Sequence, residues 1–158
     1  MEDTKNNILI LGIGNEILTD DGIGPKLVIE LKKVIKHQHV SFLTAAAGGL
    51  EILEMIRDYD KVIIIDAIKT ENGIPGSIYY LNPKNFKETL HISSFHDVSF
   101  LTALTLAEKL NMPVPTEIDI IAIEIVEDLT FSNEFSVEVA KKYNKIYEEV
   151  LESILKSL

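Results

Sequence analysis

The feature that most limits the possible folds is the stretch from residue 8 to residue 24, ILILGIGNEILTDDGIG. It begins with four apolar residues, the pattern of a strand that is buried on both faces of a sheet. Gly12 and Gly14 follow, and they allow a sharp turn at which a side chain would clash. Asp20 and Asp21 then precede a helical pattern. A strand, a tight loop and a helix in this order indicate a parallel sheet, which binds ligands at the carboxyl ends of its strands.

The residues alone leave three interpretations of this stretch open. In the first, Asp20 and Asp21 are N-cap residues of the following helix, with Pro25 in its first turn. In the second, the glycines belong to a dinucleotide-binding fingerprint, although the position of the third glycine is occupied by Ile17. In the third, a carboxylate serves metal or acid–base chemistry, which requires partners elsewhere in the chain.

The same alternation of strands and helices continues along the chain. Strand patterns recur at residues 40–45, 61–67, 77–81 and 117–125, and helical patterns at 22–36, 50–59, 98–110 and 133–158. This order predicts an α/β fold with three layers: a twisted, mostly parallel five-stranded sheet with helices on both faces and one antiparallel edge strand. If the strand order begins 2-1-3, the loops after the first and third strands flank the topological switch point.

Two further candidate residues follow from this arrangement. Asp66 closes the apolar run of the third strand, where a buried carboxylate is costly unless it is paired or bound to a ligand. Its alternative role is to cap the next turn. His96 lies at the start of a largely apolar helix, and its alternative is a surface or capping residue. His91 is a rival histidine in an irregular segment, and we expect Glu124 to be exposed on an edge.

Composition excludes several classes of function. The 158 residues predict a single domain spanning 1–158, and the net charge of −10 argues against binding to nucleic acid or anionic lipid. The chain has no cysteine, so disulfides and a cysteine nucleophile are excluded and any metal site must use oxygen and imidazole ligands. We expect no membrane partner and a cytoplasmic location, because no signal peptide and no apolar run of about 20 residues is found.

Taken together, the motifs resemble those of the hydrogenase maturation endopeptidases, which process the large subunit of nickel–iron hydrogenases. The resemblance covers essentially the whole chain. Its most specific part is the opening signature, GIGN at 12–15 followed by LTDDGIG at 18–24. The small-residue turn AGGLE at 47–51 resembles the family's turn less specifically. Asp66 matches the family's central aspartate and His96 falls where the family has its histidine, although the residue before it here is Phe95 rather than the commoner proline.

The resemblance implies that Asp21, Asp66 and His96 contact a metal and serve catalysis, with their individual roles unassigned. It implies a hydrolase that removes the C-terminal extension of a hydrogenase large-subunit precursor after nickel insertion. The nickel would be supplied by the precursor rather than held tightly by this chain, and it would align the scissile peptide or polarise its carbonyl. Either aspartate is instead a candidate general base. The alternative is a nickel-dependent checkpoint or chaperone that binds the precursor without cutting it.

Overall fold

The computed structural model of the protein describes residues 6–46, 48–88 and 95–158. For residues 86–88 and 95–99 it describes the backbone only. The described strands are β1 (Ile8–Ile13), β2 (Val40–Ala45), β3 (Lys61–Ile68), β4 (Ile78–Leu81) and β5 (Glu117–Glu124). The described helices are the 3-10 helix η1 (Thr19–Gly22), α1 (Ile23–Val34), α2 (Gly49–Ile56), α3 (Pro83–Glu88), α4 (Phe95–Lys109) and α5 (Val137–Ser157).

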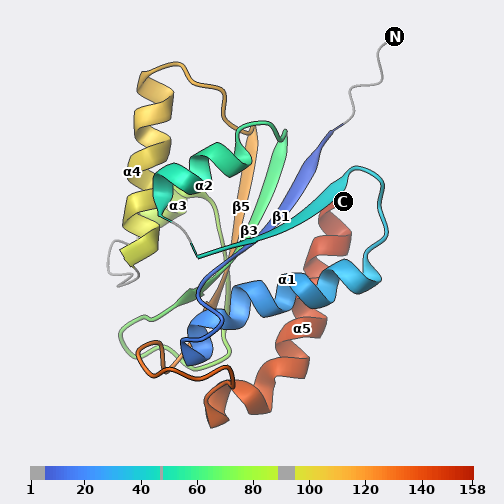
Figure 1. Ribbon diagram of the computed structural model, residues 1–158, viewed down its shortest axis with the longest axis vertical. Coiled ribbons are helices and arrows are strands. Elements are labelled where there is room, and N and C mark those ends of the chain that lie inside the picture. Colours follow the sequence, from blue (N-terminus) through green and yellow to red (C-terminus); the bar gives the residue numbers. More distant parts are fainter. Residues whose placement is uncertain (1–5, 47, 89–94) are drawn as a thin grey trace.

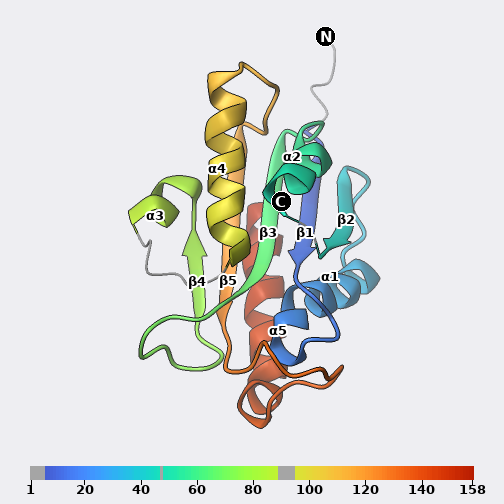
Figure 2. The same ribbon diagram turned by 60° about the vertical axis from the view of Figure 1, so that its left-hand side comes forward.

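The strands form one sheet in the order β2-β1-β3-β5-β4 (Figure 2). The first four of these strands are parallel, and β4 pairs antiparallel with β5 at the edge. The predicted fold class, the 2-1-3 start and the antiparallel edge strand are therefore confirmed. Strands β1 and β3, which have a parallel neighbour on each side, consist almost entirely of buried residues, because a strand covered on both faces has no polar side.

Helices cover both faces of the sheet (Figure 1). On one face, α2 and α4 pack against side chains of alternate β3 residues, Val62, Ile64 and Ile68. On the other face, α1 and α5 pack against the intervening residues, Ile63, Ile65 and Ala67. Many of these core side chains are fully buried, and truncating one such leucine or isoleucine to alanine typically costs about 2–5 kcal/mol.

Two helix boundaries differ from the prediction in ways that affect the site. Helix α5 begins at Val137 rather than near 133, because the Ser136 side chain accepts a hydrogen bond from the Val139 N–H and caps the helix. Helix α4 begins at Phe95 rather than at 98, which places position 96 in its first turn. Within the described part of the chain, no helix combines the length and apolarity needed to cross a membrane.

Candidate functional site

The loop after β1 is held together by one of the two neighbouring aspartates. The Asp21 Oδ2 atom accepts a hydrogen bond of 2.8 Å from the Asn15 N–H, and the Asp21 side chain is partly buried. Helix α1 has Gly22 at its N-cap and no side-chain hydrogen bond there. The interpretation of Asp20 and Asp21 as caps of α1 is therefore wrong. The carboxylate of Asp21 instead lies where the loop turns back from the carboxyl end of β1.

The glycines of this loop allow the chain to pack closely on itself. A Cβ atom on Gly12 would come within 2.6 Å of the Gly24 carbonyl oxygen in the first turn of α1. Gly14 has φ of 145°, a region that favours glycine, and a Cβ there would collide with the Asp21 carbonyl oxygen. The space above these glycines is thus filled by the chain's own backbone, whereas a dinucleotide fingerprint leaves it for a pyrophosphate.

Asp66 lies inside β3, two residues before its end, and pairs with Ala122 of β5. Its position between Ile64 and Ile68 directs its side chain to the face covered by α2 and α4. The side chain is 5% exposed, and its Oδ1 atom accepts a 2.8 Å hydrogen bond from the Ala67 N–H. A carboxylate this deeply buried needs strong compensation, which makes it a candidate functional group.

The segment carrying Asp21 lies against the strand carrying Asp66. Helix η1, which contains Asp21, contacts β3. The first turn of α1 packs directly on β3 next to Asp66, because a Cβ on Gly24 would collide with the Ile65 carbonyl oxygen. Both aspartates therefore belong to neighbouring segments at the carboxyl edge of the sheet, as the strand order predicted.

The first turn of α4 reaches the same edge. Residues 110–116 alone connect α4 to the start of β5, so α4 runs antiparallel to β5 and begins near its carboxyl end (Figure 2). Position 96 is in this first turn, on the side of the sheet that Asp66 faces. The side chain of His96 lies outside the described residues, as does all of His91. Among the described side chains no group of three suits a metal ion, so a common site of Asp21, Asp66 and His96 stays a prediction.

Asp20 has a structural role that the sequence analysis missed. We call residues 126–136, which connect β5 to α5, the strap. Asp20 is fully buried, and its carboxylate accepts hydrogen bonds of 2.8–3.2 Å from the Val126, Glu127 and Ser136 N–H groups and from the Ser136 hydroxyl. The sequence offered one indication of this role, because Ser136 is a typical helix N-cap residue. The prediction that the last helix starts at 133 placed Ser136 inside the helix instead.

Glu124 is the second missed structural carboxylate. It is 2% exposed, so the expectation of an exposed edge residue is wrong. Its two carboxylate oxygens accept hydrogen bonds of 2.8 Å from the Thr70 N–H and the Thr70 hydroxyl. The loop between β3 and β4 folds over the end of β5, and Gly73 leaves room for the carboxylate there. These donors replace water around the charge and fix the loop beside the candidate site.

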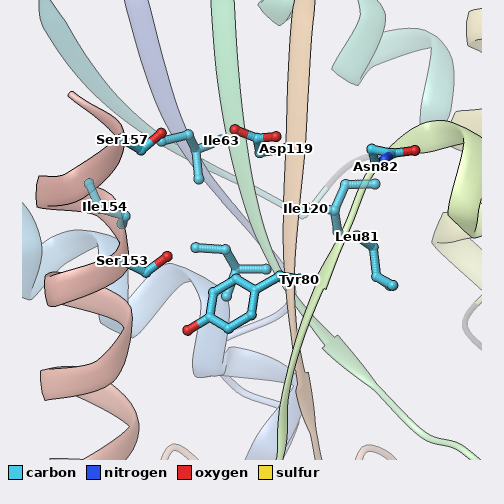
Figure 3. A pocket seen from close by; sticks show the side chains of 10 residues that line it. Ile63, Tyr80, Leu81, Asn82, Asp119, Ile120, Ser153, Ile154 and Ser157 are labelled. Atoms are coloured by element: carbon cyan, nitrogen blue, oxygen red, sulfur yellow. The ribbon is translucent and has the colours of Figure 1, made fainter.

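A cavity of about 260 Å³ lies at the opposite end of the sheet (Figure 3). It is bounded by the C-terminal part of α5, including Ser153 and Ser157, and by Tyr80 and Asp119 of β4 and β5. Asp119 is near the amino end of β5 and pairs with Ile63. The cavity is therefore separate from the edge that carries Asp21 and Asp66.

Comparison with known proteins identifies the group to which this chain is related. The model of a family described as "Hydrogenase maturation protease" matches residues 25–153. This chain belongs to the hydrogenase maturation protease family. The resemblance noted in the sequence is thereby confirmed. The matched region begins within α1 and extends nearly to the end of α5, so it includes Asp66 and position 96.

Individual members of the family give a similar picture. The hydrogenase 2 maturation protease of Escherichia coli K12 is 37% identical over 75 residues, which cover 47% of this chain and 46% of that protein. The hydrogenase expression/formation protein HupD of Thiocapsa roseopersicina is 26% identical over 139 residues, covering 85% and 62%. The matched part spans about half the length of the first curated relatives.

Solved structures of family members have the same fold. The hydrogenase maturating endopeptidase HybD from Escherichia coli superimposes with a TM-score of 0.77 and 26% identity, covering 96% of this chain and 93% of that one. The [NiFe] hydrogenase maturation protease HybD from Thermococcus kodakarensis superimposes with a TM-score of 0.66 and 24% identity, covering 92% of this chain and 97% of that one. At this identity the likeness concerns the fold only.

Proposed function

We propose that this chain is an endopeptidase that removes the C-terminal extension of a nickel–iron hydrogenase large-subunit precursor after nickel has been inserted. The observation that carries the proposal is the meeting of three segments at one edge of the sheet. These are the loop with Asp21, the end of β3 with Asp66, and the first turn of α4 with position 96. Membership of the hydrogenase maturation protease family supplies the substrate class.

The chemistry of these side chains suits nickel that another protein presents. Two carboxylates and an imidazole are oxygen and nitrogen donors, which suit borderline divalent metals. Three protein ligands also leave room for ligands that the precursor provides. In this proposal Asp21, Asp66 and His96 contact the precursor's nickel, and that contact aligns the scissile peptide at the edge of the sheet.

Hydrolysis itself adds one water molecule across the peptide bond. The water oxygen bonds to the carbonyl carbon, the carbon–nitrogen bond breaks, and a proton from water goes to the leaving nitrogen. A carboxylate within reach of the water accelerates this step as a general base, typically by about 10²–10⁴-fold. Asp66 and Asp21 are both candidates for that role, because both lie at the edge where the peptide would be held.

The test compares nickel-loaded and nickel-free precursor incubated with the purified chain, with the products weighed by intact mass spectrometry. We expect only the loaded precursor to lose the mass of its extension. Asp21→Asn and Asp66→Asn, which keep the shape of each side chain, should slow cleavage by about 10²-fold or more. Asp58→Asn is the matched control, because the side chain of Asp58 is 85% exposed and lies outside the site.

Two results would contradict the proposal. The first is a loaded precursor whose mass stays unchanged while both proteins remain folded. The second is nickel-dependent formation of a complex in which the precursor stays intact, which would favour the non-cutting checkpoint instead.

A further inference from the structure

The strap carries unusually exposed apolar side chains. Within the described residues, Leu129 at 81% and Phe131 at 78% have the highest exposed fractions of the large apolar side chains. Ile17, in the loop after β1, is 54% exposed. Single exposed apolar residues are common on soluble proteins, but a cluster of them next to a candidate site indicates a binding surface.

Backbone pairing places Ile17 beside Phe131, and Leu129 is two residues before Phe131 in the strap. Leu18 and Ser132 form a parallel β-bridge. The Ser132 N–H donates to the Ile17 carbonyl at 2.9 Å, and the Thr19 N–H donates to the Ser132 carbonyl at 2.9 Å. Ile17 and Phe131 each precede the bridged residues by one, so they occupy matched positions on one side of this pairing. We call Ile17, Leu129 and Phe131 the apolar patch.

The backbone beneath the patch is held in one shape. The Thr19 hydroxyl donates to the Thr130 carbonyl at 2.6 Å, and the Glu127 Oε1 atom accepts from the Leu129 and Thr130 N–H groups at 2.7 and 3.0 Å. Asp20 binds both ends of the strap from below. Exposed side chains on a fixed backbone lose less conformational entropy on binding than those on a loop that must first become ordered.

Position and charge indicate what binds there. Asp21 is four residues after Ile17, which limits their separation to about 14 Å even for an extended chain. Exposed Glu16 and Glu134 lie around the patch. Among the described residues near the patch, Lys69 pairs with Asp128, and Lys26 donates to the Asn133 carbonyl and lies in the field of both Glu16 and Glu134, so negative charge remains in excess. The surface therefore suits an apolar segment that carries basic residues.

We propose that the apolar patch is the docking surface for the hydrogenase precursor, and that it binds an apolar segment flanked by lysine or arginine. Docking there would hold the precursor's nickel and its scissile peptide at the edge that carries Asp21 and Asp66. This inference rests on the proposed function, because that function supplies the partner. It adds residues that recognise the partner and take no part in the hydrolysis.

The test measures cleavage rate against the concentration of nickel-loaded precursor for Leu129→Glu and Phe131→Glu. We expect KM to rise about tenfold or more for each variant, with kcat unchanged within about twofold, because a remote contact that serves binding alone changes KM. Phe131→Leu should restore most of the affinity. Leu110→Glu is the matched control, because Leu110 is 60% exposed at the far end of α4 and gains the same charge.

Several outcomes separate this inference from the proposed function. If the wild-type chain does not cut, the Kd for purified nickel-loaded precursor still tests the patch, and a tenfold increase for Phe131→Glu supports it. A KM and a Kd that stay within twofold of those of Leu110→Glu would overturn it. A change of oligomeric state in the patch variants with an unchanged KM would also overturn it, since the patch would then bind a second copy of this chain.

Discussion

Replacing Asp20 with asparagine tests whether a single buried carboxylate fastens the loop after β1 to the strap. Its Oδ2 atom accepts from the Val126 and Glu127 N–H groups at 3.2 and 3.0 Å and from the Ser136 hydroxyl at 2.8 Å. Its Oδ1 atom accepts from the Ser136 N–H at 2.8 Å. Asparagine has the same shape, but one of its terminal atoms is a donor. Whichever way the amide turns, an NH₂ group meets a donor of the strap.

The expected loss follows from the less damaging orientation. The amide nitrogen then replaces Oδ1 and faces only the Ser136 N–H. This N–H loses its hydrogen bond to a charged group and becomes a partly buried donor without an acceptor. Each of these effects costs about 1–3 kcal/mol. The free energy of unfolding should therefore fall by about 3 kcal/mol for Asp20→Asn. It should fall by about 4–5 kcal/mol for Asp20→Ala, which removes all four acceptor contacts.

Urea denaturation at neutral pH measures this change directly, and Tm should fall by roughly 6–12 °C for Asp20→Asn in a domain of this size. Asp58→Asn makes the same chemical change at a side chain that is 85% exposed, so its effect should stay within about 0.5 kcal/mol. A loss below about 1 kcal/mol for Asp20→Asn would refute the reasoning, because it would mean that the strap does not depend on this carboxylate.

Three further predictions concern the loops around the site. Gly14→Ala should lower the free energy of unfolding by at least about 2 kcal/mol, because φ of Gly14 is 145° and a Cβ there would collide with the Asp21 carbonyl oxygen. Gly48→Ala is the control in the same denaturation assay and should be tolerated, because a Cβ on Gly48 meets no atom within 4 Å. Glu124→Gln should speed hydrogen exchange at the Thr70 amide, since it removes the charge that this N–H and the Thr70 hydroxyl solvate. Hydrogen bonds from the Leu129 and Thr130 N–H groups hold the pKa of the Glu127 carboxyl below its ordinary value of 4.5. The stabilising effect of ionised Glu127 should therefore be complete above pH 4.5 and be lost as the pH falls through the lower folded-state pKa. An NMR titration of the Glu127 carboxyl carbon measures this pKa.

The strands and their order could be predicted because burial on both faces leaves an unmistakable pattern. The five residues from Val62 to Asp66 contain four β-branched apolar side chains, which fixes β3 as an inner strand. Glycine turns and helical periodicity then determine the crossovers and so place the carboxyl edge. The positions of Asp21 and Asp66 at this edge follow from the same pattern without any knowledge of side-chain contacts.

The roles of individual carboxylates could not be predicted in the same way. Asp20 and Asp21 are adjacent and chemically identical, and their difference arises from the strap, whose residues are more than 100 positions later in the chain. Glu124 ends a strand that is alternately apolar and polar at its start, which made exposure a reasonable expectation. Its burial depends on Thr70, which comes from a loop without a regular pattern. Such long-range polar contacts are specified by tertiary packing rather than by local periodicity.

The adjacency of Asp20 and Asp21 connects the proposed docking surface to the candidate site. Asp20 binds the strap that presents Leu129 and Phe131, while Asp21, the next residue, accepts from the Asn15 N–H in the same loop. We therefore expect a displacement of the strap to move the segment from which Asp21 projects. Asp20→Asn should for this reason raise KM and lower kcat together in the precursor assay, whereas the patch variants should change KM alone. An Asp20→Asn protein that is less stable but has an unchanged kcat at a temperature where it remains folded would show that the strap and the site are mechanically independent.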